Sequence, residues 1–365
     1  MTGMRQRVRY CSSEVDGTRI AYAQRGSGPV IVKSGNSLSH LEFEKDSSVW
    51  RHFATALTRD YSYINYDPRG CGLSDRSPRD MSFEASLSDL EAVVDAANLP
   101  QFSLLAVCGG SAAALAYAAN HPERVTHLVI HGGYALGPMR RNGVSHVREV
   151  YESIAKLVEF GWEATSPAIR QMMALQFLPD ATEDHYRAFH AFARASVSSE
   201  SFARRFRALY DLDVAEFACR ITCPTLVTHS MRDPWVPIEE GQYLASLIPQ
   251  AQFVPIRSQN HLLLEHEPGW RDWIEEVRAF IPAGQIDLPA FGGLTRRERE
   301  LVDLMARGLS NTEIASSLEL SPKTVKNYVN SVFAKVDVTN RAQLIVRARD
   351  AGFGNGPGLE RVSAA

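Results

Sequence analysis

Short apolar runs alternate with longer segments of helical periodicity over the first 280 residues. The runs are rich in β-branched and aromatic residues, which favour strands. We expect strands at residues 19–22, 30–33, 61–66, 103–107, 126–131, 225–230 and 252–256. Helices are expected between them, near residues 49–59, 83–97, 109–120, 239–247 and 269–280. This alternation predicts an α/β fold with a mainly parallel sheet between helices, and Asp16-Gly17 predicts an antiparallel hairpin near its start.

The last quarter of the chain has a different pattern, in which signals for helix starts recur at short intervals. They are Thr295 with Glu298, Ser310 with Glu313, Ser321-Pro322, and Asn340. The first two match the S/T-x-x-E capping box, and a serine followed by proline is typical of the first helical position. Helices of about 8 and about 15 residues, separated by the break Glu319-Leu320-Ser321, fit a helix-turn-helix with its second helix in the DNA major groove.

Polar side chains are expected on the free face of that second helix, where they would contact phosphates and base edges. These candidate DNA-binding residues are Lys323, Thr324, Lys326, Asn327 and Asn330. The charge distribution gives weak support to DNA binding by this region. Residues 290–365 hold 11 basic and 8 acidic residues (+3), whereas the rest of the chain holds 28 basic and 34 acidic residues (−6). An excess this small favours a homodimer that binds two half-sites of an operator. A helical bundle used only for protein contacts is the alternative.

Residues 294–353 resemble the LuxR-type helix-turn-helix domain in three motifs, LTRRERE, GLSNTEIA and SPKTVK. The resemblance implies a double-stranded DNA operator, dimerisation through the last helix, and RNA polymerase as a possible partner. Tyr328 and Asn330 stand where the family often has histidine and a basic residue. The base preference is therefore expected to differ.

Composition adds few constraints. A length of 365 residues with 45% hydrophobic and 22% charged residues is typical of a globular protein of two folded units. The sequence has no apolar run long enough to cross a membrane and no signal-peptide core, so we expect a cytoplasmic protein. Five cysteines without C-x-x-C spacing suggest neither disulfides nor a metal site, and no cofactor is expected.

The block FSLLAVCGGSAAALAYAANHPERVTHLVIHGG has the order strand, glycine turn, alanine-rich helix, strand, as in a nucleophile elbow. Because of this block and the motif YDPRGCGLSD, residues 7–281 resemble the α/β-hydrolase superfamily. The resemblance implies a helical cap at about residues 138–218. The whole chain resembles bacterial LuxR-type regulators with an α/β-hydrolase-fold sensing domain. The expected division is a sensor domain at 1–281, a linker at 282–293, the DNA-binding domain at 294–353, and a tail at 354–365.

Cys108 is the expected nucleophile of this elbow. The family places that residue 13 positions before the histidine of HPERV, here His121, whereas the competitor Ser111 falls three residues into the helix. Asp233 and His261 follow expected strands in the order acid, then base, so the triad would be Cys108, Asp233 and His261. Backbone N–H groups of Gly35, Asn36 and Gly109 are candidates for an oxyanion hole. Ala106 and Ser34 depart from the family pattern of glycine and histidine.

A small molecule is expected to bind around Cys108, in a largely apolar pocket. The candidate lining residues are Ser34, Cys108, Met172, Phe177, Phe189, Phe206, Trp235 and His261. A cysteine on a buried turn is more often a packing residue than a nucleophile, and aromatic residues at helical spacing are usually core. Three functions remain open: a regulator that binds its ligand reversibly, a working esterase, thioesterase or lactonase fused to a DNA-binding domain, and a covalent sensor of electrophiles.

Overall fold

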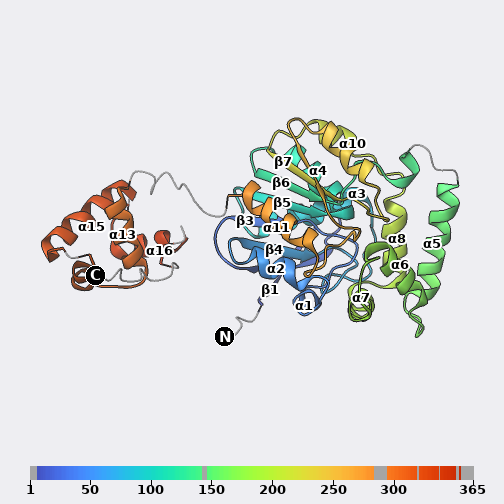
Figure 1. Ribbon diagram of the computed structural model, residues 1–365, viewed down its shortest axis with the longest axis horizontal. Helices are drawn as coiled ribbons and strands as arrows, with labels where there is room; N and C mark the ends of the chain where they lie inside the picture. The colour runs from blue at the N-terminus through green and yellow to red at the C-terminus, as the bar shows by residue number, and fades with distance from the viewer. Residues whose placement is uncertain are drawn as a thin grey trace. The chain divides into compact units, whose positions relative to one another are not determined.

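The chain folds as two compact units that separate between Ile281 and Pro282 (Figure 1). The computed structural model describes residues 6–141, 146–282, 294–318, 320–336, 338–350 and 353–354. Apart from Pro282, the expected linker at 282–293 lies outside the described residues, as do Glu319 of the expected break and the tail beyond Gly354.

The first unit is built on an eight-stranded sheet with the order β1-β2-β4-β3-β5-β6-β7-β8. β2 is antiparallel to both of its neighbours, and the remaining pairs are parallel. The strands are β1 (Val8–Ser12), β2 (Arg19–Arg25), β3 (Val30–Lys33), β4 (Ser62–Asp67), β5 (Phe102–Val107), β6 (Val125–His131), β7 (Thr225–Ser230) and β8 (Gln252–Ile256). All seven expected strands form. β1 was not expected, because its alternating pattern is short and largely exposed.

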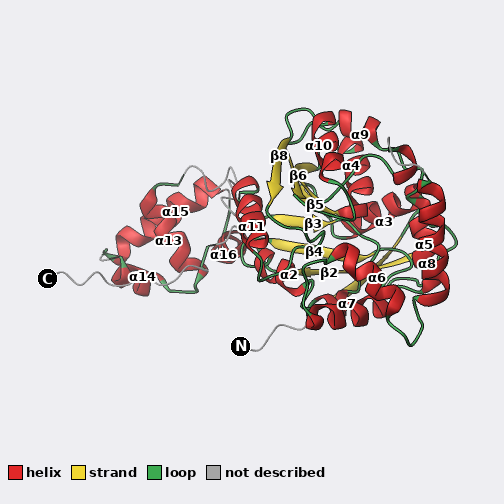
Figure 2. Cartoon of the chain, turned by 45° about the vertical axis from the view of Figure 1, so that its right-hand side comes forward, coloured by secondary structure: helices red, strands yellow, loops and turns green. Residues whose placement is uncertain are grey.

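Helices cover both faces of this sheet (Figure 2). Side chains of α2 (Arg51–Leu57) and α11 (Pro268–Phe280) pack in one core. Side chains of α3 (Phe83–Ala96), α4 (Ser111–Asn120) and α10 (Ile238–Leu247) pack in the other. Every residue of β4, β5 and β7 is buried, as expected of parallel strands covered on both faces. The α/β prediction is confirmed.

The cap is part of the segment of the chain that connects β6 to β7, and it lies on one side of the sheet (Figure 1). It comprises the 3-10 turn η2 (Pro138–Arg140), α5 (Val147–Gly161), α6 (Ala168–Phe177), α7 (Glu183–Ser196) and α8 (Ser199–Ala208). The next helix, α9 (Ala215–Cys219), packs against α4 and α10. α5 packs against α8, and the indole N–H of Trp162 donates to the carbonyl of Val197 at 3.2 Å. The short helix α1 (Leu41–Glu44) follows β3.

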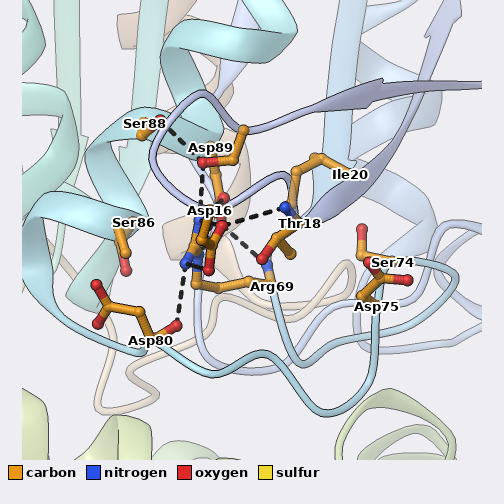
Figure 3. Close-up of polar contacts among 12 residues, drawn as sticks. Asp16, Thr18, Ile20, Arg69, Ser74, Asp75, Asp80, Ser86, Ser88 and Asp89 are labelled. Carbon is orange, nitrogen blue, oxygen red and sulfur yellow. Dashed lines mark hydrogen bonds and ion pairs between the residues drawn. The ribbon is translucent and has the colours of Figure 1, made fainter.

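A buried arginine holds the loop after β4 in place (Figure 3). Arg69 is fully buried and pairs with Asp89 of α3 at 2.8 Å and with Asp16 of the β1–β2 turn at 3.1 Å. Its backbone carbonyl accepts a hydrogen bond from Arg205 of α8. One residue therefore joins the hairpin, a sheet-covering helix and the cap, and fixes the loop beneath the cap.

The second unit is a bundle of α13 (Arg296–Ala306), α14 (Asn311–Ser317), α15 (Pro322–Val336) and α16 (Arg341–Asp350). Its core contains Leu301, Ile314, Val325, Val332 and Leu344. Both expected capping boxes form, on Thr295 with Glu298 and on Ser310 with Glu313. The helices start where the sequence signals place them.

Candidate functional site

Cys108 sits at the tip of a strained turn between β5 and α4. Its φ is 53°, in the left-handed region that costs energy for a residue with a side chain. A Cβ on Gly110 would lie 3.0 Å from the carbonyl oxygen of Gly35, so the turn packs closely on the loop after β3. Ser111 is buried, and its Oγ lies 3.3 Å from the carbonyl oxygen of Tyr134. Cys108 therefore lies at the tip of the turn, whereas Ser111 lies in the helix that follows it.

His261 and Asp233 meet in a buried pair beside this turn. His261 Nδ1 lies 2.6 Å from Asp233 Oδ2, and both side chains are fully buried. The other carboxylate oxygen accepts hydrogen bonds from the backbone N–H groups of Trp235 and Val236, at 2.9 and 3.0 Å. These bonds fix the carboxylate, and the carboxylate in turn fixes the imidazole.

The pair favours a charged imidazole. Burial alone would lower the pKa of His261, but attraction to Asp233 and to Cys108 outweighs it and raises that pKa. For Asp233 burial is likewise opposed, chiefly by attraction to His261, and its pKa is held below the usual range. A glycine makes room for the pair, since a Cβ on Gly132 would lie 2.9 Å from His261 Cε1.

The second ring nitrogen of His261 is available for chemistry. Nε2 is buried and has no hydrogen-bond partner among the described residues, and the Cys108 side chain is near enough to interact with the ring electrostatically. A nucleophile next to a base that a carboxylate orients is the arrangement used in acyl transfer. Of the oxyanion candidates, Asn36 and Gly109 line the same cavity as Cys108, and Gly35 lines a hollow next to it.

A cavity opens between Cys108 and the cap. It is partly enclosed and most of its lining surface is apolar, as is usual for small-molecule pockets. Phe177, Phe206 and Trp235 form an aromatic wall, with ring centroids 4.9 Å apart for Phe177 and Trp235 and 5.9 Å apart for Phe206 and Trp235. With Cys108 and His261, these are five of the eight expected lining residues.

The other three expected lining residues lie elsewhere. Ser34 directly follows β3 and has no exposed surface, and its N–H donates to the carbonyl of Leu105 at 2.8 Å. Phe189 of α7 is fully buried in the core that α2 and α11 share, and Met172 of α6 packs against the same core. Their side chains point into the packing beneath the cap, a direction that helical spacing alone does not reveal. We leave these three residues out of the candidate site.

Several further lining residues are not among the eight candidates. They are Ser37, Leu38, Trp50, Tyr134, Pro138, Arg141, Tyr151, Phe202, Leu209, Tyr210, Val236 and Leu262. Tyr134 follows β6 by three residues, so the strand-end rule that selected Asp233 and His261 would also have found it. The cap residues carry no such signal, because their direction depends on how the cap helices pack.

The candidate DNA-binding surface lies on α15. Lys323, Lys326, Asn327 and Asn330 are exposed, and the valines of the opposite face are buried. Thr324 is only partly exposed, with its hydroxyl 2.8 Å from that of Ser321 at the helix start. Four of the five expected residues are therefore free to reach DNA directly.

Glu298 of α13 fixes the orientation of α15. Besides capping its own helix, its carboxylate accepts hydrogen bonds from Ser331 and Lys335 of α15, both at 2.7 Å. The capping glutamate that marks the helix start in the sequence thus also joins two helices.

The described residues contain no group of three or more ligating side chains that could hold a metal ion. No helix among them is long and apolar enough to span a bilayer.

Comparison with known proteins gives two family matches. Residues 30–268 match the model of the alpha/beta hydrolase fold, and residues 293–348 match that of bacterial regulatory proteins of the luxR family. Pyrrolizixenacetamide deacetylase from Xenorhabdus hominickii is 25% identical over 272 residues, which cover 73% of this chain and 96% of the deacetylase.

Two further similarities concern one unit each. The monoamine regulon transcriptional regulator of Klebsiella aerogenes is 46% identical over 61 residues, 17% of this chain and 26% of that regulator. The solved esterase from Exiguobacterium antarcticum superposes with a TM-score of 0.64 at 21% identity, covering 74% of this chain and 98% of the esterase. The predicted combination of the two domain types is confirmed.

Proposed function

The chain belongs to the alpha/beta hydrolase fold family and carries a LuxR-type DNA-binding domain, and on this premise we propose that it is a ligand-responsive transcriptional regulator. A small molecule binds in the cavity at Cys108 and changes how the C-terminal domain binds its operator. The observation that carries the proposal is the largely apolar cavity between Cys108, His261 and the cap, in the same chain as the exposed polar face of α15.

The proposed DNA complex contains two copies of the chain. One recognition helix of 15 residues and a net charge of +3 in residues 290–365 (11 basic, 8 acidic) give a single domain limited contact with DNA, and a dimer doubles that contact. RNA polymerase is a proposed partner, because a regulator bound beside a promoter either contacts the polymerase or blocks it.

Regulation requires the ligand to bind two conformations of the protein with different affinities. A coupling free energy of about 1–3 kcal/mol changes operator affinity roughly 5- to 150-fold.

The test combines DNA binding with substitution of the cavity. Operator DNA selected from a random library is titrated with the full-length protein, with and without lactones and esters that raise its Tm. We expect Cys108→Ala to bind the operator like wild type without ligand and to respond differently with it, because Cys108 lies in the cavity and not on α15. An unchanged response in Cys108→Ala, and in a cavity-filling variant such as Leu209→Trp, would refute the proposal.

Covalent chemistry at Cys108 is the second candidate function, favoured by the 2.6 Å bond between His261 and Asp233. In this reaction the proton of the Cys108 thiol resides on His261, and the thiolate sulfur bonds to the ester carbonyl carbon. The carbon–oxygen bond then breaks, and the alcohol leaves with that proton. Intact mass spectrometry distinguishes the cases: a lasting adduct at Cys108 indicates a covalent sensor, released acid and alcohol indicate a hydrolase, and neither product indicates reversible binding.

A further inference from the structure

The wall of the cavity carries positive charge and no carboxylate. Arg141 is the only arginine, lysine, aspartate or glutamate among its described lining residues, and His261 adds a second positive group. The rest of the wall is aromatic, aliphatic or uncharged. A cation inside such a wall attracts an anion strongly, because little water screens it.

Arg141 is held in place through its Nε group, which contacts both a backbone carbonyl and a carboxylate. The side chain is 12% exposed, and Nε donates to the carbonyl of Leu136 at 3.0 Å. Glu240 Oε2 forms an ion pair with the same Nε at 3.3 Å, and Glu240 is not among the described residues that line the cavity. No hydrogen bond of the terminal Nη1 and Nη2 groups occurs within the described part of the chain.

Two tyrosines connect Arg141 to the elbow. The guanidinium carbon lies 4.8 Å from the centre of the Tyr134 ring. The Tyr134 hydroxyl lies 3.5 Å from the place a Cβ would take on Gly109, next to Cys108. Tyr151 lines the same part of the cavity and interacts electrostatically with both Arg141 and Cys108.

We propose that Arg141 binds a carboxylate of the ligand, with the ligand's apolar body against the aromatic wall and its far end toward Cys108. The inference rests on the proposed function and adds the chemical class, an amphiphilic carboxylic acid. A guanidinium offers two parallel N–H groups that match the two oxygens of a carboxylate. The aromatic wall accounts for the apolar body.

The test uses ω-phenylalkanoic acids from phenylacetate to 6-phenylhexanoate, together with their uncharged primary amides. Binding to the full-length protein is measured by titration calorimetry. We expect at least one acid to bind tenfold or more tightly than its amide. Arg141→Met should abolish this preference and leave amide binding unchanged, because it removes the charge but keeps most of the stem.

The neighbouring arginine provides the matched control. Arg140 is exposed and does not line the cavity, so Arg140→Met should keep the preference for acids. If Arg141→Met fails to fold, Arg141→Lys tests the same point. Lysine keeps the positive charge but lacks the two parallel N–H groups, so this variant should bind the acid more weakly relative to the amide.

Three results would overturn the inference: equal binding of acids and amides, no binding of any acid, or a preference that His261→Gln removes and Arg141→Met leaves intact. The last would place the carboxylate at the triad. Operator affinity measured in the same samples separates the two proposals. An acid that binds through Arg141 without altering DNA binding supports the carboxylate site and refutes the proposed function.

Discussion

Individual residues at the site combine a strained backbone with buried charge. Cys108 adopts a φ of 53°, and such strain persists only where the surrounding structure enforces it. Here the tight packing of Gly110 on the loop of Gly35 does so. The buried Asp233 and His261 stabilise each other as an ion pair, and each would be costly to bury alone.

The ion pair predicts how stability depends on pH. The pKa of His261 is raised in the folded protein, so its charged form contributes stability that is complete below about pH 6.5, the ordinary histidine value. That contribution is lost as pH rises through the raised pKa. The pKa of Asp233 is lowered, so its contribution to folding stability is constant over this pH range and is lost only in acid.

We therefore expect His261→Gln to lower the free energy of unfolding most near pH 6, with a deficit that shrinks steadily toward pH 9. Guanidinium denaturation in a Cys108→Ala background measures this without a thiol at the site. In an Asp233→Asn background the pH trend should disappear, because the main cause of the raised pKa is gone. A deficit that stays constant from pH 6 to pH 9 with Asp233 present would contradict the assignment.

At the scale of elements, polar side chains fix how neighbouring segments sit together. Arg69 joins the β1–β2 turn, α3 and the cap helix α8, and Glu298 joins α13 to α15. The hydrophobic cores bring these elements together without direction, whereas hydrogen bonds to a buried charge select one arrangement. The loop after β4 and the helix α15 are both positioned in this way.

Removing Asp89 should destabilise the first unit by about 3–5 kcal/mol, because it leaves the charge of Arg69 buried without its closest partner. Chemical denaturation of Asp89→Ala, followed by Trp fluorescence, measures the loss. Arg187→Ala is the control: its pairs with Glu183 and Asp184 are exposed, and it should change stability by less than about 1 kcal/mol. Similar losses in the two variants would show that burial of the Arg69 pair is unimportant.

For the whole molecule, the two units have separate tasks that the proposed function joins. The first contains the cavity, and the second contains the exposed face of α15. Substitutions on the exposed face of α15 should therefore leave the cavity unaffected. The two activities can then be removed one at a time.

The double substitution Lys326→Ala with Asn330→Ala should remove sequence-specific operator binding and leave ligand affinity unchanged. Lys326 would contact a phosphate and Asn330 a base edge, and loss of one base contact costs about 1–3 kcal/mol. Gel shift with selected operator DNA and calorimetry with the acids described above measure the two properties. Exposed Lys156 on the cap helix α5 gives the control Lys156→Ala, which should bind operator normally. Retained specificity in the double variant would exclude this face as the DNA reader.

The sequence alone predicted seven of the eight strands and the two domain types, and it placed Cys108, Asp233 and His261 at strand ends. The signals used are the hydrophobic periodicity, the capping boxes and the positions at strand ends. Each of them is local, because it depends on only a few consecutive residues. They located the strands, Cys108, Asp233, His261 and the polar face of α15. The antiparallel hairpin was also signalled by Asp16-Gly17, although the short, exposed β1 was not.

Only the tertiary structure decided which cap side chains face the cavity. It excluded Met172 and Phe189, and it brought Tyr134, Tyr151 and Arg141 to the side of Cys108. The direction of a helical side chain toward core or cavity depends on how that helix packs against segments far away in the sequence. The charge of the cavity wall follows from this packing, and so does the chemical class of ligand that we propose.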